Sequence, residues 1–207
     1  MNDRLRILLV FLFAFSGSAG VFAEEHSSVP SVQNLQPYYI NESADLGRYN
    51  KVYVDNLKVI DARVIAPPWY EGDDKSPRKW RLTNKDIEFL RNSYRAAIIE
   101  QLQAGGYPVV EVIDADDVLI LDVEIITLMP YARKGEDVQV RGFGELKAQA
   151  TLRDGLTSDL IAIFEGVQDV GSEYQQNSRL NAENNLKELF DIWGQRMRKL
   201  LDDNRGS

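Results

Sequence analysis

Cysteine is absent from this sequence of 207 residues, and there is a single histidine. Without cysteine no disulfide can form, and no thiolate can act as a nucleophile or a metal ligand. The histidine, His26, lies in a polar stretch near the N-terminus, where we expect no ordered site. We therefore exclude Ser-His-Asp triads and zinc sites built from histidine and cysteine, and expect an apolar core alone to hold the fold together.

The sequence has fewer basic than acidic residues: 24 Lys and Arg residues and 32 Asp and Glu residues give a net charge of −8. An acidic protein is repelled by the phosphates of nucleic acids and by anionic membrane surfaces. We therefore expect no nucleic-acid partner. Hydrophobic residues make up 44% of the chain and charged residues 27%, a balance that is typical of a globular domain with a core.

A hydrophobic run long enough to cross a bilayer is also missing. The apolar run at residues 7–15 follows two arginines and precedes several small residues, and it is far shorter than the roughly 20 residues that a transmembrane helix needs. The pattern predicts a cleaved signal peptide over residues 1–23 rather than an uncleaved anchor. Because Glu24 and not a cysteine follows, we expect no lipid anchor and no transmembrane helix in the mature chain. The expected location is the periplasm, or the medium if the protein is secreted.

After the signal peptide, we expect a polar N-terminal arm at residues 24–47 and a single α+β domain at residues 48–203. Helical spacing and strand alternation of apolar residues predict the order β-α-β-β-β-β-α. The predicted fold is a mostly antiparallel sheet of about five strands with two helices packed on one face. The strands are predicted at residues 51–60, 107–112, 118–128, 138–153 and 160–167, and the helices at residues 83–104 and 182–201.

Local signals support these elements. Thr83, followed three residues later by Asp86, is typical of a capping box at the start of the first helix, and two glycines follow its end. In the strand at residues 118–128, apolar residues alternate with acidic ones, so we expect one buried face and one wet face. The Asp154-Gly155 pair predicts the turn of a hairpin between the last two strands.

Two kinds of motif suggest a ligand but have simpler explanations. The RGFG segment at residues 141–144 begins like an RNA-recognition signature, yet Glu145 stands where the next aromatic residue belongs. We therefore interpret its glycines as marking a bulge or a bend in a strand. The acidic clusters at residues 71–74 and 114–117 lack the spacing of an EF-hand loop, so we interpret them as turns with solvated charges rather than calcium sites.

Asp122 and Glu124 are the best candidates for a catalytic pair. Residues two apart on one strand face place their carboxyl groups about 6 to 7 Å apart, which suits a glycoside hydrolase. The same spacing is ordinary on a wet strand face. A carboxylate-only hydrolase acting on cell-wall glycans is therefore the alternative function, and we assign no catalytic residue, metal ligand or cofactor.

A long connection at residues 61–82 carries three aromatic residues among mixed charges: Trp69, Tyr70 and Trp80. Exposed aromatic residues are typical anchors of a binding surface. The other reading is that they fold back over the core as a lid. We take these three as the candidate partner-binding residues.

Several segments together resemble the bacterial envelope family catalogued as domain of unknown function 3313. They are KVYVDNLKVI, IIEQLQAGGYPVVEV, DADDVLILDVEIITL, LKAQATLRDGLTSDLIAIFEG and LFDIWGQRMRKLLDD. The resemblance implies an envelope location, since members of that family are mostly predicted outer-membrane lipoproteins. It implies no activity and no functional residues. This chain differs from such members in lacking the cysteine for lipid attachment.

The function that we expect is that of a non-enzymatic periplasmic binding or accessory protein of the bacterial envelope. Export, a complete core, the aromatic connection and the lack of a catalytic constellation favour it. The expected partner is another envelope protein. A third reading, a carrier of a small apolar ligand held between the helices and the sheet, requires a cavity in that place.

Overall fold

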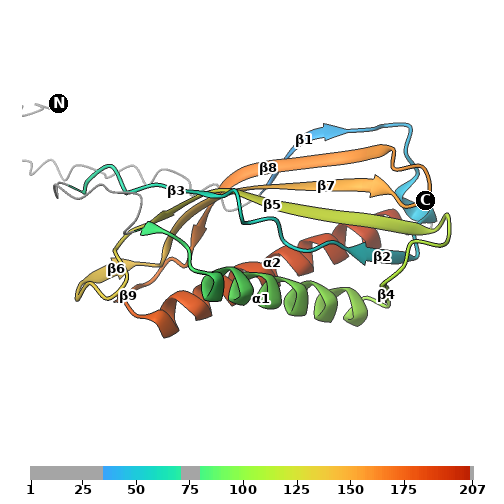
Figure 1. Cartoon of the computed structure of the whole chain (residues 1–207). Helices are drawn as coiled ribbons and strands as arrows, with labels where there is room; N and C mark the ends of the chain where they lie inside the picture. The colour runs from blue at the N-terminus through green and yellow to red at the C-terminus, as the bar shows by residue number, and fades with distance from the viewer. Residues whose placement is uncertain (1–34, 71–79, 206–207) are drawn as a thin grey trace, which may run out of the picture. The chain divides into compact units, whose positions relative to one another are not determined.

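The computed structural model describes residues 35–70 and 80–205, which belong to one compact unit of the chain. The predicted signal peptide and residues 24–34 of the predicted arm lie outside the described residues. Figure 1 shows the elements in chain order. They are β1 (Gln36–Ile40), the short 3-10 helix η1 (Leu46–Arg48), β2 (Lys51–Val54), β3 (Arg63–Val64), α1 (Asn84–Ala104), β4 (Val109–Val110), β5 (Val118–Pro130), β6 (Gln139–Arg141), β7 (Gly144–Asp154), β8 (Leu160–Val170), β9 (Tyr174–Gln176) and α2 (Arg179–Asn204).

A mixed sheet forms one layer, and both helices lie on the same side of it (Figure 1). The strand order is β1-β8-β7-β5-β2-β4, and β3 pairs with a later stretch of β5. Strands β1, β8, β7 and β5 are antiparallel neighbours, whereas β2 runs parallel to β4 and β5, and β3 runs parallel to β5. The predicted α+β class is confirmed. The prediction of a mostly antiparallel sheet of about five strands is wrong in part, because the sheet is mixed and has seven strands.

The connection through α1 explains the parallel part of the sheet. The chain leaves β2, passes through β3 and α1, and returns in the same direction as β4 beside β2. A helical crossover joins parallel strands, while a tight turn joins antiparallel ones. Strands β7 and β8 are joined by such a turn and pair from Gly144 with Val170 to Arg153 with Leu160, which confirms the predicted hairpin.

Three short strands of the sheet differ in place or in length from the sequence predictions. Strand β1 lies inside the predicted polar arm and pairs with β8, although all five of its residues are exposed. The predicted strand at residues 51–60 forms regular strand structure only as β2, and the one at residues 107–112 only as β4. The pairing of β1 depends on the neighbouring β8 rather than on an alternating pattern of its own.

Both helices begin at capped residues. The Thr83 hydroxyl accepts a hydrogen bond from the Asp86 N–H at 3.3 Å, and the Thr83 N–H donates to the Asp86 carboxylate at 2.7 Å, so the predicted capping box is confirmed. Helix α2 begins at Arg179, earlier than predicted, because the Ser178 hydroxyl accepts from the Asn181 N–H at 3.2 Å. An N-cap of this kind satisfies backbone donors that the helix itself leaves unpaired.

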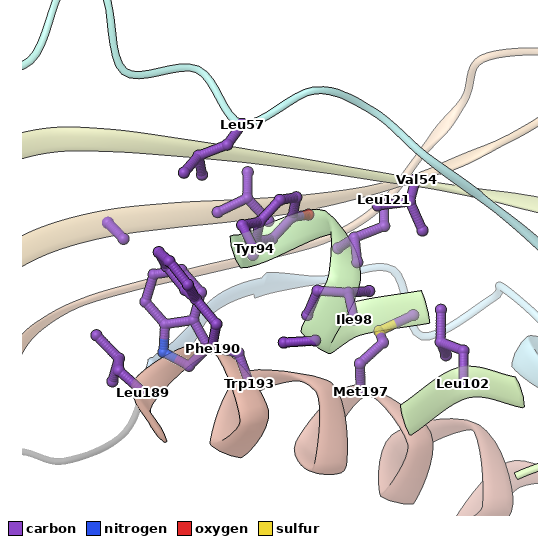
Figure 2. Packing of buried hydrophobic residues seen from close by; sticks show 14 of the residues in the cluster. Val54, Leu57, Tyr94, Ile98, Leu102, Leu121, Leu189, Phe190, Trp193 and Met197 are labelled. Atoms are coloured by element: carbon purple, nitrogen blue, oxygen red, sulfur yellow. The ribbon is translucent and has the colours of Figure 1, made fainter. Parts of the chain in front are cut away.

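The core fills the space between the two helices and the sheet (Figure 2). The rings of Tyr94 and Phe190 meet edge to face at 5.9 Å, and those of Phe190 and Trp193 at 5.4 Å. The alternating apolar residues of β5 face this layer, as the sequence predicts. The buried residues of the helices are Leu90, Tyr94, Ala97, Ile98 and Leu102 in α1, and Leu186, Leu189, Phe190, Trp193, Gly194, Met197 and Leu201 in α2.

The predicted strand at residues 138–153 is divided by a bend at Gly142 and Phe143. Gly142 has a φ of +66°, a left-handed conformation that favours glycine. The first part, β6, leaves the main sheet and pairs with β9 in a separate two-stranded sheet, while the second part, β7, stays in the main sheet. The interpretation of these glycines as a bend is therefore confirmed.

The bend at Gly142 leads to a stability prediction. A Cβ atom at this position would collide with the backbone carbonyl oxygens of Val170 and Gly171. We expect Gly142→Ala to lower the free energy of unfolding by about 2 kcal/mol or more, since the left-handed conformation alone costs about 1 to 2 kcal/mol. Gly135→Ala is the matched control, because Gly135 has a φ of +75° but nothing lies near its Cβ position. Urea unfolding should show a larger loss for Gly142→Ala; an equal loss would contradict the collision.

Candidate functional site

A pocket of about 460 Å³ lies where the N-terminal ends of α1 and α2 meet the end of β5. Figure 1 shows that both helices begin at the same end of the sheet. We call this the helix-end pocket. Its walls are mainly apolar and include Leu82, Phe89, Leu128, Phe143, Ala182 and Leu186, and its charged residues are Lys85, Asp86, Lys134, Arg179 and Glu183.

The helix caps position the polar rim of the helix-end pocket. Thr83 and Ser178, which cap the two helices, both line it. Each cap hydroxyl accepts a hydrogen bond from a backbone N–H of its own helix. Lys85, two residues after the first cap, and Arg179, directly after the second, lie in the first turns of α1 and α2.

The two carboxylates of the rim are both paired with cations. Asp86 forms an ion pair with Lys134, and Glu183 forms one with Arg179 at 2.5 Å. Burial alone would raise the pKa of Asp86, but hydrogen bonds from Lys134 and Thr83 outweigh it and lower the pKa. The hydrogen bonds from Lys134 and Thr83 therefore favour the anionic form of the Asp86 carboxyl.

The three aromatic residues predicted to bind a partner have different environments. Trp69 is 57% exposed, and its ring rests against that of Tyr131 at 5.1 Å. Tyr70 meets Trp80 edge to face at 5.6 Å and lies under the guanidinium of Arg133. Trp80 is only 5% exposed and lines the helix-end pocket. The structure therefore brings Tyr70 and Trp80 together, and leaves Trp69 as the member of the three with an exposed ring.

Sequence reasoning missed most of the helix-end pocket. Phe89 lies off the main buried stripe of α1, and Phe143 sits between two glycines at the bend. An aromatic residue in either position does not by itself indicate a pocket. Only the fold brings these residues next to Leu128 and Leu186.

The carboxylates proposed for catalysis lie elsewhere. Asp122 and Glu124 alternate with the buried residues of β5 and thus face away from the helices. Asp122 forms an ion pair with Lys58, and Glu124 is exposed. Neither lines the helix-end pocket.

From the sequence we expect neither a metal site nor a transmembrane helix, and the described residues bear on both expectations. Within residues 35–70 and 80–205, no group of three potential ligands is arranged to hold a metal ion. The cluster at residues 71–74 and His26 lie outside the described residues. No described helix combines the length and the apolarity that a membrane crossing requires.

A second pocket, of about 290 Å³, lies along the other half of α2. Leu35, Phe164, Trp193 and Met197 are among its residues. Its walls are also mainly apolar, so it is a smaller alternative to the helix-end pocket. Tyr94, which also lines it, is fully buried, and this burial raises the pKa of its hydroxyl.

Comparisons with known proteins give a family and weak structural similarities. A family model described as protein of unknown function (DUF3313) matches residues 25–197. No curated protein matches the chain. Among solved structures, protein XCC0632 from Xanthomonas campestris is 12% identical, with 84% of this chain and 93% of that chain covered and a TM-score of 0.45. The PelC dodecamer from Paraburkholderia phytofirmans is 14% identical, with 75% and 93% covered and a TM-score of 0.39. A minor lipoprotein from Acinetobacter baumannii is 11% identical, with 75% and 94% covered and a TM-score of 0.35.

Proposed function

Because this chain belongs to the DUF3313 family of proteins of unknown function, we propose its role from its own pocket: it is an exported, non-enzymatic binding protein that holds an apolar ligand at the helix ends. The observation that carries the proposal is the helix-end pocket itself. Its volume of about 460 Å³ falls in the range of roughly 300 to 1,000 Å³ that is usual for small-molecule sites.

The walls of the pocket favour an apolar ligand. Phe89, Leu128 and Phe143 come from a helix, a strand and the bend between β6 and β7, so three separate parts of the fold present apolar surface to one space. Transfer of an apolar ligand from water to such a surface is favourable by roughly 25 cal/mol for each Å² buried. This arrangement fits the reading of the protein as a carrier.

The polar groups of the pocket favour binding over catalysis. Its acidic residues, Asp86 and Glu183, are already neutralised by cations. The carboxylates that the hydrolase would need, Asp122 and Glu124, lie on the opposite face of the sheet. A carboxylate-only hydrolase requires two carboxyl groups converging in a cleft, so the described residues favour the binding protein.

The site of action that we propose is the periplasm, on the strength of the signal-peptide pattern at residues 1–23. An exported carrier of an apolar ligand must exchange that ligand with something, and another envelope protein is the partner that we propose. Trp69, which is exposed on the segment leading to the pocket, is the residue best placed to contact it.

Binding of an uncharged apolar fluorophore, N-phenyl-1-naphthylamine, tests this function. We expect the protein to enhance its fluorescence with a stoichiometry of one. Ala182→Phe should abolish most of the enhancement, because Ala182 lines the helix-end pocket and a phenyl ring there occupies the space of the ligand. The measurement is a fluorescence titration.

The matched control is Asn184→Phe, which places the same ring on an exposed position of α2 outside the pocket. It should bind the fluorophore like the wild type. If Ala182→Phe also binds like the wild type, the ligand does not occupy the helix-end pocket and the proposal is wrong; the pocket along the other half of α2 then becomes the candidate.

A further inference from the structure

The charges at the rim of the helix-end pocket differ in sign from the charge of the whole chain. Three cations, Lys85, Lys134 and Arg179, line the pocket with two carboxylates, Asp86 and Glu183. The chain as a whole carries a net charge of −8. A local excess of one positive charge in an acidic protein lowers the repulsion that an anion meets there.

The two carboxylates of the rim already have partners, which leaves the positive charge of the rim in excess. Asp86 is occupied by Lys134 and by the backbone and hydroxyl of Thr83. Glu183 is occupied by Arg179. Lys85, by contrast, has no ion-pair partner among residues 35–70 and 80–205. The Lys85 ammonium is therefore the charged group of the rim that is available to pair with a ligand.

The N-terminal ends of the two helices add to the positive electrostatic potential at the rim. Helix α1 has 21 residues and α2 has 26, and both begin at the pocket. The N-terminal end of a helix carries a partial positive charge, and its first backbone N–H groups are donors. The caps already bind the N–H groups of Asp86 and Asn181. The N–H groups before these in each helix, like the Lys85 ammonium, are donors that match an anionic head group rather than a cationic one.

We propose that the ligand is a single-chain amphiphile with an anionic head, its apolar chain against Phe89, Leu128 and Phe143 and its head at the rim beside Lys85. This inference rests on the proposed function, since it names the class of ligand for the same pocket. A fatty-acid carboxylate and a lysophospholipid phosphate share this chemistry. The apolar walls set the affinity for the hydrocarbon chain of the ligand, and the rim selects the charge of its head group.

Four probes with the same decyl chain test the inference: decanoate, decyl phosphate, decanol and decyltrimethylammonium. Isothermal titration calorimetry with the full mature chain should show both anions binding about tenfold more tightly than decanol. The cation should bind more weakly than decanol. Tighter binding of decanoate would indicate a carboxylate ligand, and tighter binding of decyl phosphate a phosphate one.

Lys85→Gln separates the charge from the apolar walls. This change should weaken the binding of decanoate about threefold and leave the affinity for decanol unchanged. The matched control is Lys187→Gln, which removes the same charge from an exposed position of α2 outside the pocket and should change neither affinity. Raising the ionic strength from about 0.01 to about 0.15 M should reduce the preference for decanoate over decanol, because salt screens the rim.

The two proposals fail in different ways. If decanol binds as tightly as decanoate and Lys85→Gln changes nothing, the pocket still binds an apolar ligand, and only the anionic head is wrong. If none of the four probes binds, the proposed function itself is wrong. Tighter binding of decyltrimethylammonium than of decanoate would overturn the assignment of charge at the rim.

Discussion

Replacing Trp193 with alanine is expected to lower the free energy of unfolding by about 3 to 5 kcal/mol. The side chain is 6% exposed, packs edge to face against the Phe190 ring in the core (Figure 2) and donates its indole N–H to the Gln168 side-chain oxygen at 2.7 Å. Its removal leaves a cavity and also leaves that buried oxygen of Gln168 without its donor. The expected loss is a large share of the stability of a domain this size. Urea unfolding followed by far-UV circular dichroism measures it.

Two further variants separate the causes of this loss. Trp193→Phe keeps an aromatic ring but removes the donor to Gln168, so we expect an intermediate loss of about 1 to 3 kcal/mol. Trp69→Ala removes an indole ring that is 57% exposed, and should change stability by about 0.5 kcal/mol or less. Equal losses for Trp193→Ala and Trp69→Ala would show that Trp193 does not anchor α2 to the sheet.

Asp154→Asn is expected to destabilise the protein by about 2 to 3 kcal/mol at pH 7, and by progressively less as the pH falls from about 4 to 2. Asp154 is 3% exposed at the end of β7. Burial alone would raise the pKa of this carboxyl, but hydrogen bonds from the Thr157 backbone and the Tyr49 hydroxyl outweigh it and lower the pKa to about 2. Arg48 adds an ion pair.

The direction of the pH effect follows from this lowered pKa. A carboxyl whose folded pKa lies below its unfolded value of about 3.9 stabilises the fold in its charged form. That stabilisation is complete above the unfolded pKa and is lost as the pH falls through the folded one. The difference between wild type and Asp154→Asn in unfolding free energy, measured from pH 7 to pH 2, should therefore shrink toward acid.

Asp114→Asn is the control for this titration. Asp114 is exposed and lies in the turn before β5. Its replacement should change stability little at any pH. A difference between wild type and Asp154→Asn that stays constant down to pH 2 would contradict the role of the charged carboxylate in holding the turn between β7 and β8.

The contrast between Thr83 and β1 shows which parts of the fold sequence reasoning can reach. The capping box at Thr83 is made by residues three apart, so its signal is contained in a few letters. Strand β1 has no buried residue and no alternation, and it exists because β8 offers an edge to pair with. The parallel pairing of β2 with β5 joins residues on either side of α1, a separation that no local pattern records.

The candidate site shows the same limit. The sequence shows Trp80 as one of the aromatic residues of its segment, but its place in the helix-end pocket depends on residues from both helices. Phe143 stands out in the sequence only between the two glycines of the bend. Its place in the wall of the helix-end pocket depends on the pairing of β7 with β5 and on the nearby ends of the two helices.

By itself the sequence determined the α+β class, the two amphipathic helices, the hairpin of β7 and β8 and membership of the DUF3313 family. The class, the helices and the hairpin depend on periodic apolar residues, caps and turns, whose physics acts over a few residues. Only the tertiary structure decided the mixed direction of the sheet, the pairing of β1 and the assembly of the helix-end pocket with its positive rim. Those features join residues far apart in the chain, and they arise when burial of the shared core fixes how the elements pack.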